Sequence, residues 1–307
     1  MRSPVSRRAL LALGGTGIAG VGFGVATNAD SDRPTAARID CPDYGDRIDA
    51  TVCNEAGRVG LLFEPSTASM TAPGSITFAL RNRSGRTFNT NQYGWRLHKY
   101  EDGTWFNVAR RTIPLPLHSL RVGGSMEWTL SIDNDGLENG GRLDSPDRSH
   151  ARFRGLRDGI YAFGIDGWSA SDDADAKTAL VETFELTAEP LSLEPAPTVS
   201  SVEWSEDDGS ETLVARTDRL NGAERATAYE LVRVDGSRSG ERIIFEQVVR
   251  DEQLRTLLAL AENRGAGRVR LEDRRETGSR FGRTVDNGDI LEYDGIEYRF
   301  GSRDLEE

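Results

Sequence analysis

The sequence predicts a mainly β protein, in which a β-sandwich is followed by a smaller α+β domain. Two observations predict this class: apolar and polar residues alternate with a period of two in short runs, and turns rich in Gly, Asn and Asp separate the runs. A third is a single amphipathic helix pattern that comes only after a proline-marked linker. With 307 residues, the chain is long enough for two ordinary domains.

Five segments are expected along the chain. Residues 1–29 are expected to be a signal peptide, and 30–58 a linker that contains a cysteine loop. The sandwich is expected over 59–189. A linker follows at 190–198, where prolines disfavour helix and favour an extended connection. The remaining segment, 199–305, has the size of a full domain.

The N-terminus carries the most specific motif. Arg7 and Arg8 precede a weakly apolar run over 9–26, and small residues follow at Thr27 and Ala29. This order resembles a twin-arginine export signal and implies an extracellular or cell-surface protein exported by that route. An uncleaved anchor is the alternative, but the glycines of the run disfavour a transmembrane span. The literal GxGxxG at 15–20 has no preceding strand, so a dinucleotide site is not expected.

The chain has only two cysteines, Cys41 and Cys53. In an exported protein the expected state of such a pair is a local disulfide. The alternative is a metal site that would recruit ligands from His98, His118 and His150. These histidines lack the close spacing of metal ligands, so the disulfide is favoured.

The sandwich is predicted from about seven short strands. They are expected at 59–63, 76–80, 93–97, 105–108, 126–132, 160–165 and 180–186. Seven short strands with regular turns favour an immunoglobulin-like (Ig-like) arrangement. Aromatic residues at period-two spacing are expected in its core, namely Tyr93, Trp95, Trp105, Phe106 and Trp128.

Further motifs in this region are typical of one family. They are Y-G-W-R-L-H-K at 93–99, D-G at 102–103, Trp105, R-V-G-G at 121–124, Trp128 and L-R-D-G-I-Y at 156–161. Together they resemble the bacterial-type Ig-like domain of secreted and membrane-anchored proteins. The resemblance implies an Ig-like fold and a surface location, and names no ligand. Gly123 and Asp158 stand where that pattern has proline, and an insertion over 133–153 lengthens one loop.

The last segment, 199–305, is predicted to form an antiparallel sheet with one helix packed on it, and it resembles no family. Strands are expected at 202–204, 212–216, 228–234, 242–249, 267–271 and 290–300. An Asp-Gly turn at 294–295 would set Leu291 opposite Tyr298. The helix is expected between Asp251 as N-cap and Gly265 just past its end.

The charge balance limits the partners. The chain has 38 basic and 50 acidic residues, and only Lys99 and Lys177 are lysines. A net charge of −12 makes nucleic acid an unexpected partner, because phosphate binding needs a basic face. An acidic, lysine-poor composition resembles that of halophilic proteins, in which salt screens carboxylate repulsion. A merely acidic protein is the alternative.

Two single residues are candidates for surface roles. Asn82 begins the sequon Asn82-Arg83-Ser84 and is a candidate for glycosylation in an exported chain. Trp168 follows the strand at 160–165 and precedes an acidic loop, so it is a candidate for contact with a ligand or partner. The run Asp133-Asn134-Asp135-Gly136 has the start of a calcium loop without its later ligands, and is interpreted as a solvated turn.

The sequence contains no recognisable catalytic motif. The sequence has no GxSxG elbow, no phosphate-binding loop and no HExxH. The expected function is therefore non-enzymatic binding of a cell-envelope protein or glycan, with no catalytic residue, cofactor or metal. The alternative is an exported hydrolase or small-ligand sensor whose site lies within 199–305, between the segment at 242–249 and the helix that follows it.

Overall fold

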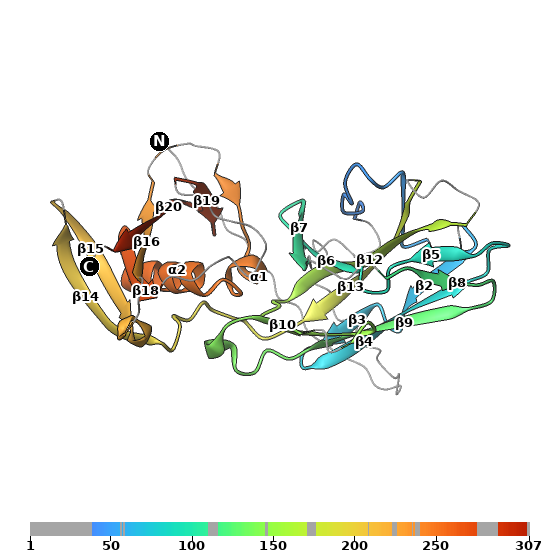
Figure 1. The fold of residues 1–307 in the computed structure, drawn as a ribbon, viewed down its shortest axis with the longest axis horizontal. Helices are drawn as coiled ribbons and strands as arrows, with labels where there is room; N and C mark the ends of the chain where they lie inside the picture. Colours follow the sequence, from blue (N-terminus) through green and yellow to red (C-terminus); the bar gives the residue numbers. More distant parts are fainter. Residues whose placement is uncertain are drawn as a thin grey trace, which may run out of the picture. The chain divides into compact units, whose positions relative to one another are not determined.

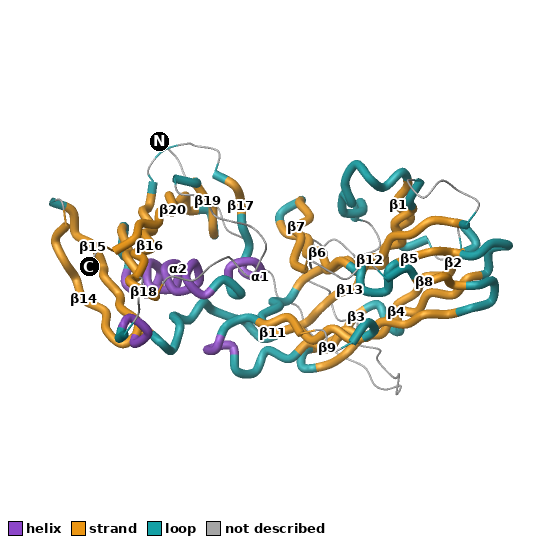
Figure 2. The backbone as a smooth tube through the Cα atoms, in the orientation of Figure 1, coloured by secondary structure: helices purple, strands orange, loops and turns teal. Residues whose placement is uncertain are grey.

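The protein is mainly β, with three sheets and two α-helices in the described part of the chain (Figures 1 and 2). None of the helices described is long and apolar enough to cross a bilayer. The computed structural model describes residues 39–55, 57, 59–109, 116–144, 147–170, 176–207, 209–222, 226–234, 236, 240–274 and 288–305.

An eight-stranded sheet is built around one long hairpin. Strands β12 (Gly159–Ser169) and β13 (Thr178–Thr187) pair in antiparallel register. Two short strands from the N-terminal part, β1 (Ala50–Cys53) and β3 (Ser69–Thr71), both join β13 in parallel. The other strands lie on the β12 side, namely β5 (Phe88–Thr90), β6 (Arg96–Glu101), β7 (Thr104–Ala109) and β8 (His118–Leu120).

A five-stranded sheet has the order β10-β11-β9-β4-β2. The predicted strands at 76–80 and 126–132 are confirmed as β4 (Gly74–Asn82) and β9 (Ser125–Ile132), and β2 is Leu61–Pro65. The insertion at 133–153 is more than a loop. It supplies β10 (Arg142–Asp144) and most of β11 (His150–Arg154), and β11 joins β9 in parallel.

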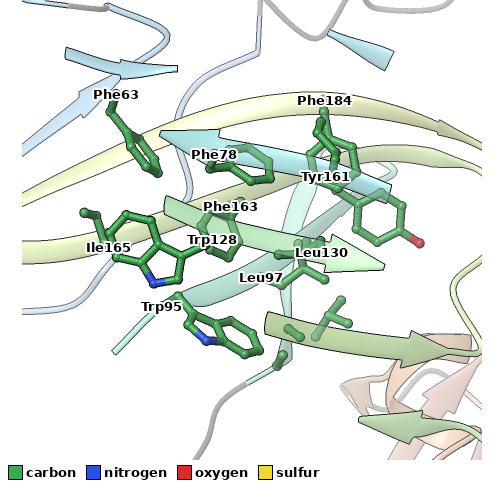
Figure 3. Packing of buried hydrophobic residues seen from close by; sticks show 14 of the residues in the cluster. Phe63, Phe78, Trp95, Leu97, Trp128, Leu130, Tyr161, Phe163, Ile165 and Phe184 are labelled. Atoms are coloured by element: carbon green, nitrogen blue, oxygen red, sulfur yellow. The ribbon is translucent and has the colours of Figure 1, made fainter. Parts of the chain in front are cut away.

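These two sheets share one apolar core (Figure 3). The rings of Phe78 on β4 and Phe163 on β12 stack with centroids 4.4 Å apart. The prediction of a buried aromatic core is confirmed for Trp95, Phe106 and Trp128. Figure 3 shows rings from several strands meeting around Phe163. Period-two spacing predicts this packing because it places each ring on the inner face of its strand.

The strand predicted at 93–97 begins later than expected. Gln92 and Tyr93 lie in a turn, in which the Gly94 amide donates to the Asn91 carbonyl oxygen at 2.8 Å. Strand β6 therefore starts only at Arg96. Trp95, at the end of this turn, is still buried. Its apolar ring packs into the core although the residue is not in a strand.

The C-terminal sheet has seven strands in the order β14-β15-β18-β16-β20-β19-β17. Its strands are β14 (Val199–Asp207), β15 (Ser210–Thr217), β16 (Ala226–Arg233), β17 (Glu241–Arg242), β18 (Arg268–Arg274), β19 (Ile290–Tyr293) and β20 (Ile296–Leu305). The β19–β20 turn sets Leu291 opposite Tyr298, as predicted. The expectation of an antiparallel sheet is wrong, because β15–β18 and β17–β19 are parallel pairs.

The predicted helix is confirmed as α2 (Glu252–Arg264). The Asp251 carboxylate accepts from the Leu254 amide at 3.0 Å, which satisfies one of the free donors of the first turn. Gly265 has a φ of 60°, a left-handed conformation that favours glycine and ends the helix. The apolar face of α2 packs against β16 and β18 (Figure 1).

The strand predicted over 242–249 is wrong. Only Glu241 and Arg242 form a strand, and Phe245–Val248 form a short helix, α1. The apolar residues of this run are also spaced as on one face of a helix. Phe245, Val248 and Val249 stand at i, i+3 and i+4, and all three are buried in one cluster. A period-two pattern would have put Val248 and Val249 on opposite faces.

Candidate functional site

The disulfide is the one predicted site that the structure confirms. Cys41 and Cys53 are bonded, with their Cα atoms 5.9 Å apart. Cys53 ends β1, so the bond ties the preceding segment to the edge of the eight-stranded sheet. The export motif at Arg7 and Arg8 lies outside the described residues, and so does the acidic stretch at 171–175 that follows Trp168.

Asn82 has a structural role. Its side chain is fully buried at the end of β4. The amide nitrogen donates to the carbonyl oxygens of Arg86, at 2.8 Å, and of Leu120, at 2.9 Å. The amide oxygen accepts from the backbone and hydroxyl of Ser84. Both amide hydrogens are therefore used in the fold, and a glycan would replace one of them, so glycosylation of Asn82 stays a prediction.

Trp168 is partly exposed near the end of β12. The Lys177 ammonium lies 5.9 Å from the centre of its ring, within the range of a cation–π contact. The same ammonium lies 3.6 Å from the Asp166 carboxylate. These contacts hold the ring beside charged groups, and its role as a contact for a partner stays a prediction.

The three histidines do not converge. His98 is buried against Tyr44, and burial, followed by the positive charge of Arg96, lowers the pKa of His98 to about 4. His150 pairs instead with Asp147, whose carboxylate lies 2.9 Å from the imidazole. In the described ranges, no three His, Cys, Asp or Glu side chains group as ligands for a metal ion.

Glu182 on β13 is a titratable group in the neutral range. Burial, followed by the negative charge of Glu64, raises the pKa of Glu182 from 4.5 to about 7. The folded chain thus binds a proton more tightly than the unfolded chain. The free energy of unfolding therefore falls as pH rises from about 4.5 to about 7. Above that range it stays at the lower value.

Glu182→Gln is accordingly expected to raise the free energy of unfolding by about 1 to 2 kcal/mol at pH 8, after allowing for solvent screening, and to change it little near pH 4.5. Denaturant titrations at several pH values measure this. Glu185→Gln on the same strand, where the carboxylate is exposed, is the control and should show no such gain. A gain for Glu182→Gln that is equal at all pH values would contradict the titration argument.

A buried polar cluster joins α1 to the eight-stranded sheet. Glu246 on α1 is fully buried, and its Oε1 atom accepts from the Lys99 ammonium at 2.8 Å and the Arg157 amide at 3.0 Å. The Tyr161 hydroxyl lies 3.0 Å from the same atom and also donates to the Arg157 carbonyl oxygen. We call these residues, Lys99, Arg157, Tyr161 and Glu246, the Glu246 cluster. No sequence motif predicted it.

Further polar contacts surround the Glu246 cluster. The Gln247 amide donates to the Asn107 carbonyl oxygen at 3.1 Å, and Arg250 donates to the carbonyl oxygen of Val108. Arg242 pairs with Asp102. Burial lowers the pKa of Arg250 to about 10, against the opposing effect of Glu246's negative charge. These groups pair with one another across the contact, so the arrangement is suited to holding α1 against β6 and β7.

The region between α1 and α2, where the alternative hydrolase or sensor site was expected, is occupied by apolar side chains. Phe245, Val248, Leu254, Leu257 and Leu258 belong to one buried cluster there. The polar side chains of α1, Glu246 and Gln247, point to the other sheet instead. The described side chains therefore bring no converging polar groups together at that position.

The C-terminal sheet has a second face, which α2 does not cover. Leu213, Val269, Leu231 and Phe300 point to the helix side, so the residues that alternate with them point away. Strand register places these in rows across β15, β18, β16 and β20. One row is Arg216–Glu272–Ala228–Arg303, the next is Val214–Arg270–Glu230–Gly301, and a third contains Arg268, Val232 and Arg299.

We call this surface the arginine face. Its charged residues on these four strands are six arginines and three glutamates, namely Arg216, Arg268, Arg270, Arg274, Arg299, Arg303, Glu230, Glu272 and Glu297. Three arginines converge on Glu230, with N–O distances of 2.9 Å from Arg270, 3.5 Å from Arg268 and 3.7 Å from Arg303. The flanking strands β14 and β19 add Glu203, opposite Val214, and Glu292, opposite Glu297, so arginines and glutamates are interleaved over this face.

Sequence reasoning missed the arginine face, although one signal was present. In R-V-R-L-E-D-R at 268–274, charged and apolar residues alternate, which predicts a strand with one charged face. Glu230, which lies opposite Arg270, is 40 positions from it along the chain, and Arg303, on the next strand β20, is 33 positions from it. Only the register shows that they are neighbours. No protein-family model matches this chain, and no curated protein has a significantly similar sequence.

Proposed function

We propose that this protein is an exported, non-enzymatic binding protein of the cell surface or its surroundings, which contacts an envelope component or a partner protein. The observation that carries this proposal is the arginine face, where six arginines lie with three glutamates on the side of the C-terminal sheet away from α2. Specific function resides in such sites and not in the fold class. Guanidinium groups on a flat surface are suited to binding carboxylate, sulfate or phosphate groups.

The finer architecture belongs to the same proposal. The eight- and five-stranded sheets are interpreted as an Ig-like sandwich with additional edge strands, and the C-terminal sheet with α1 and α2 as a separate α+β domain. The shared aromatic core of the first two sheets and the second apolar cluster around α2 support this interpretation. The Glu246 cluster would then fix the orientation of one domain against the other.

Export and binding are tested together in the source cell. A tagged chain is fractionated in native salt, crosslinked, and its partners are identified by mass spectrometry. We expect recovery from the envelope with a defined protein or glycan. Replacing Arg7 and Arg8 with lysine keeps the charge and is expected to leave the chain in the cytoplasm. Export of that double variant, or recovery of the wild type as a free monomer in the medium, would contradict the proposal.

A further inference from the structure

Strand β14 is a free edge of the C-terminal sheet (Figure 1). Among the described strands it pairs with β15 alone, so the backbone N–H and C=O groups of alternate β14 residues face away from the sheet. From Ser201 to Asp207 the register with β15 is continuous, and this stretch contains no bulge, proline or lysine. Those are devices by which edge strands avoid further pairing, so β14 is suited to accept another strand.

An aromatic side chain lies beside this edge. Trp204 is on the same face of β14 as Val202, which packs against the apolar cluster around α2. Trp204 lies opposite Leu213 on β15 and is 48% exposed, whereas Leu213 is buried. A strand paired with β14 would cover more of this ring. Trp204 therefore offers an apolar anchor at the free edge.

The charge at this edge is negative. Residues 203–211 contain five acidic residues and no basic one. Glu206 lies opposite Glu211 on the same face as Trp204, and neither forms an ion pair within the described part of the chain. Arg216, which is the one basic residue of the β14–β15 hairpin, is already paired with Glu203 and Glu272. Like charges in opposite positions destabilise a sheet, and a cation beside Glu206 would relieve their repulsion.

These charges select among extended segments. A second copy of this chain is disfavoured, because pairing of β14 with β14 would bring the acidic residues of both copies together. A segment rich in Lys or Arg is favoured instead. Its side chains would lie beside the Glu206 carboxylate and the exposed face of the Trp204 ring, where ion pairs and cation–π contacts attract them.

We propose that β14 accepts an extended, Lys- or Arg-rich segment of a partner protein as an added strand, with Trp204 and Glu206 contacting its basic side chains. This inference rests on the proposed binding function and names the class of one partner. The edge is a different surface from the arginine face. The purified protein tests it regardless of where the cell places the chain, so failure here and failure of export are distinguishable.

The probe is a fluorescent peptide of alternating Lys and Thr, and binding is followed by fluorescence anisotropy at the lowest salt that keeps the native circular dichroism spectrum. We expect micromolar binding, and no binding of a matched Glu-Thr peptide. Trp204→Ala is expected to weaken binding about tenfold, and Glu206→Gln about threefold. Glu127→Gln, which removes an exposed carboxylate from β9, is the matched control and should leave affinity unchanged.

Hydrogen exchange separates strand addition from the general attraction of a basic peptide to an acidic protein. An added strand bonds to the outward backbone groups of β14, so amide exchange within 199–207 is expected to slow about tenfold or more in the complex. Contact through side chains alone would leave these rates unchanged. Circular dichroism checks that each variant folds.

Three results would overturn the proposal. The first is the absence of binding by the Lys-Thr peptide, and the second is binding that does not slow exchange in β14. The third is an equal effect of Glu206→Gln and Glu127→Gln on affinity. Protection of β14 that rises with protein concentration in the absence of peptide would identify a second copy as the occupant, and would also contradict it.

Discussion

Lys99→Met is expected to lower the free energy of unfolding by about 3 to 5 kcal/mol. The Lys99 ammonium is the cation bonded to the fully buried carboxylate of Glu246. Without it, that carboxylate stays in a medium of low polarity with the Arg157 backbone amide as its direct donor, because the single hydroxyl hydrogen of Tyr161 is donated to the Arg157 carbonyl oxygen. Chemical denaturation in the protein's native salt measures the loss.

The chain offers a matched control for this experiment in its only other lysine. Lys177→Met removes a partly exposed ammonium that lies 3.6 Å from Asp166, and its expected cost is below about 1 kcal/mol. The double variant Lys99→Met, Glu246→Gln removes both charges and is expected to recover most of the loss. Equal costs for the two lysine variants would show that Glu246 does not depend on Lys99.

Phe163→Ala is expected to cost about 3 to 5 kcal/mol, the other large effect in this molecule. Phe163 has no exposed surface, and its ring lies between 4.4 and 6.4 Å from the rings of Phe78, Trp95, Phe63 and Trp128. Truncation removes contacts with both sheets of the shared core, and neighbouring strands hold the cavity open. Thermal unfolding followed by near-ultraviolet circular dichroism measures this loss of stability.

Two comparisons separate cavity formation from a general loss of apolar surface. Phe163→Leu keeps most of the volume and is expected to cost less than half as much as the alanine variant. Trp204→Ala on β14 removes a larger ring that is 48% exposed, and is expected to change stability by less than about 1 kcal/mol. If Trp204→Ala were as costly as Phe163→Ala, the shared core would not be the main source of stability.

The elements that sequence reasoning predicted are those fixed by neighbours in the chain. Asp251 and Gly265 bound α2 through local hydrogen bonds and a left-handed residue. The Asp-Gly turn sets the register of β19 and β20 within four residues. At 242–249 the same reasoning failed, because a short apolar run is compatible with either periodicity.

The candidate site could not be predicted because its members meet only through the fold. Glu246 is one of 50 acidic residues, and nothing local separates it from a solvated carboxylate. Its partner did carry a signal, since Lys99 is one of only two lysines in an arginine-rich chain. The parallel pairs β1–β13 and β15–β18 likewise join segments that no turn connects. The Ig-like assignment and export remain predictions.

The pairing of β1 with β13 also governs when the chain can fold. Ala50 lies opposite Thr178, so β1 has no partner until more than a hundred further residues have been synthesised. At about 5 to 20 residues per second, this takes the ribosome on the order of 6 to 25 s. During that time the early strands expose unpaired edges, which is the usual route to aggregation. Residues 1–178 contain 21 acidic and 21 basic residues, so the growing chain has no net charge to keep such edges apart, and the acidic excess arrives only with the segment after residue 178.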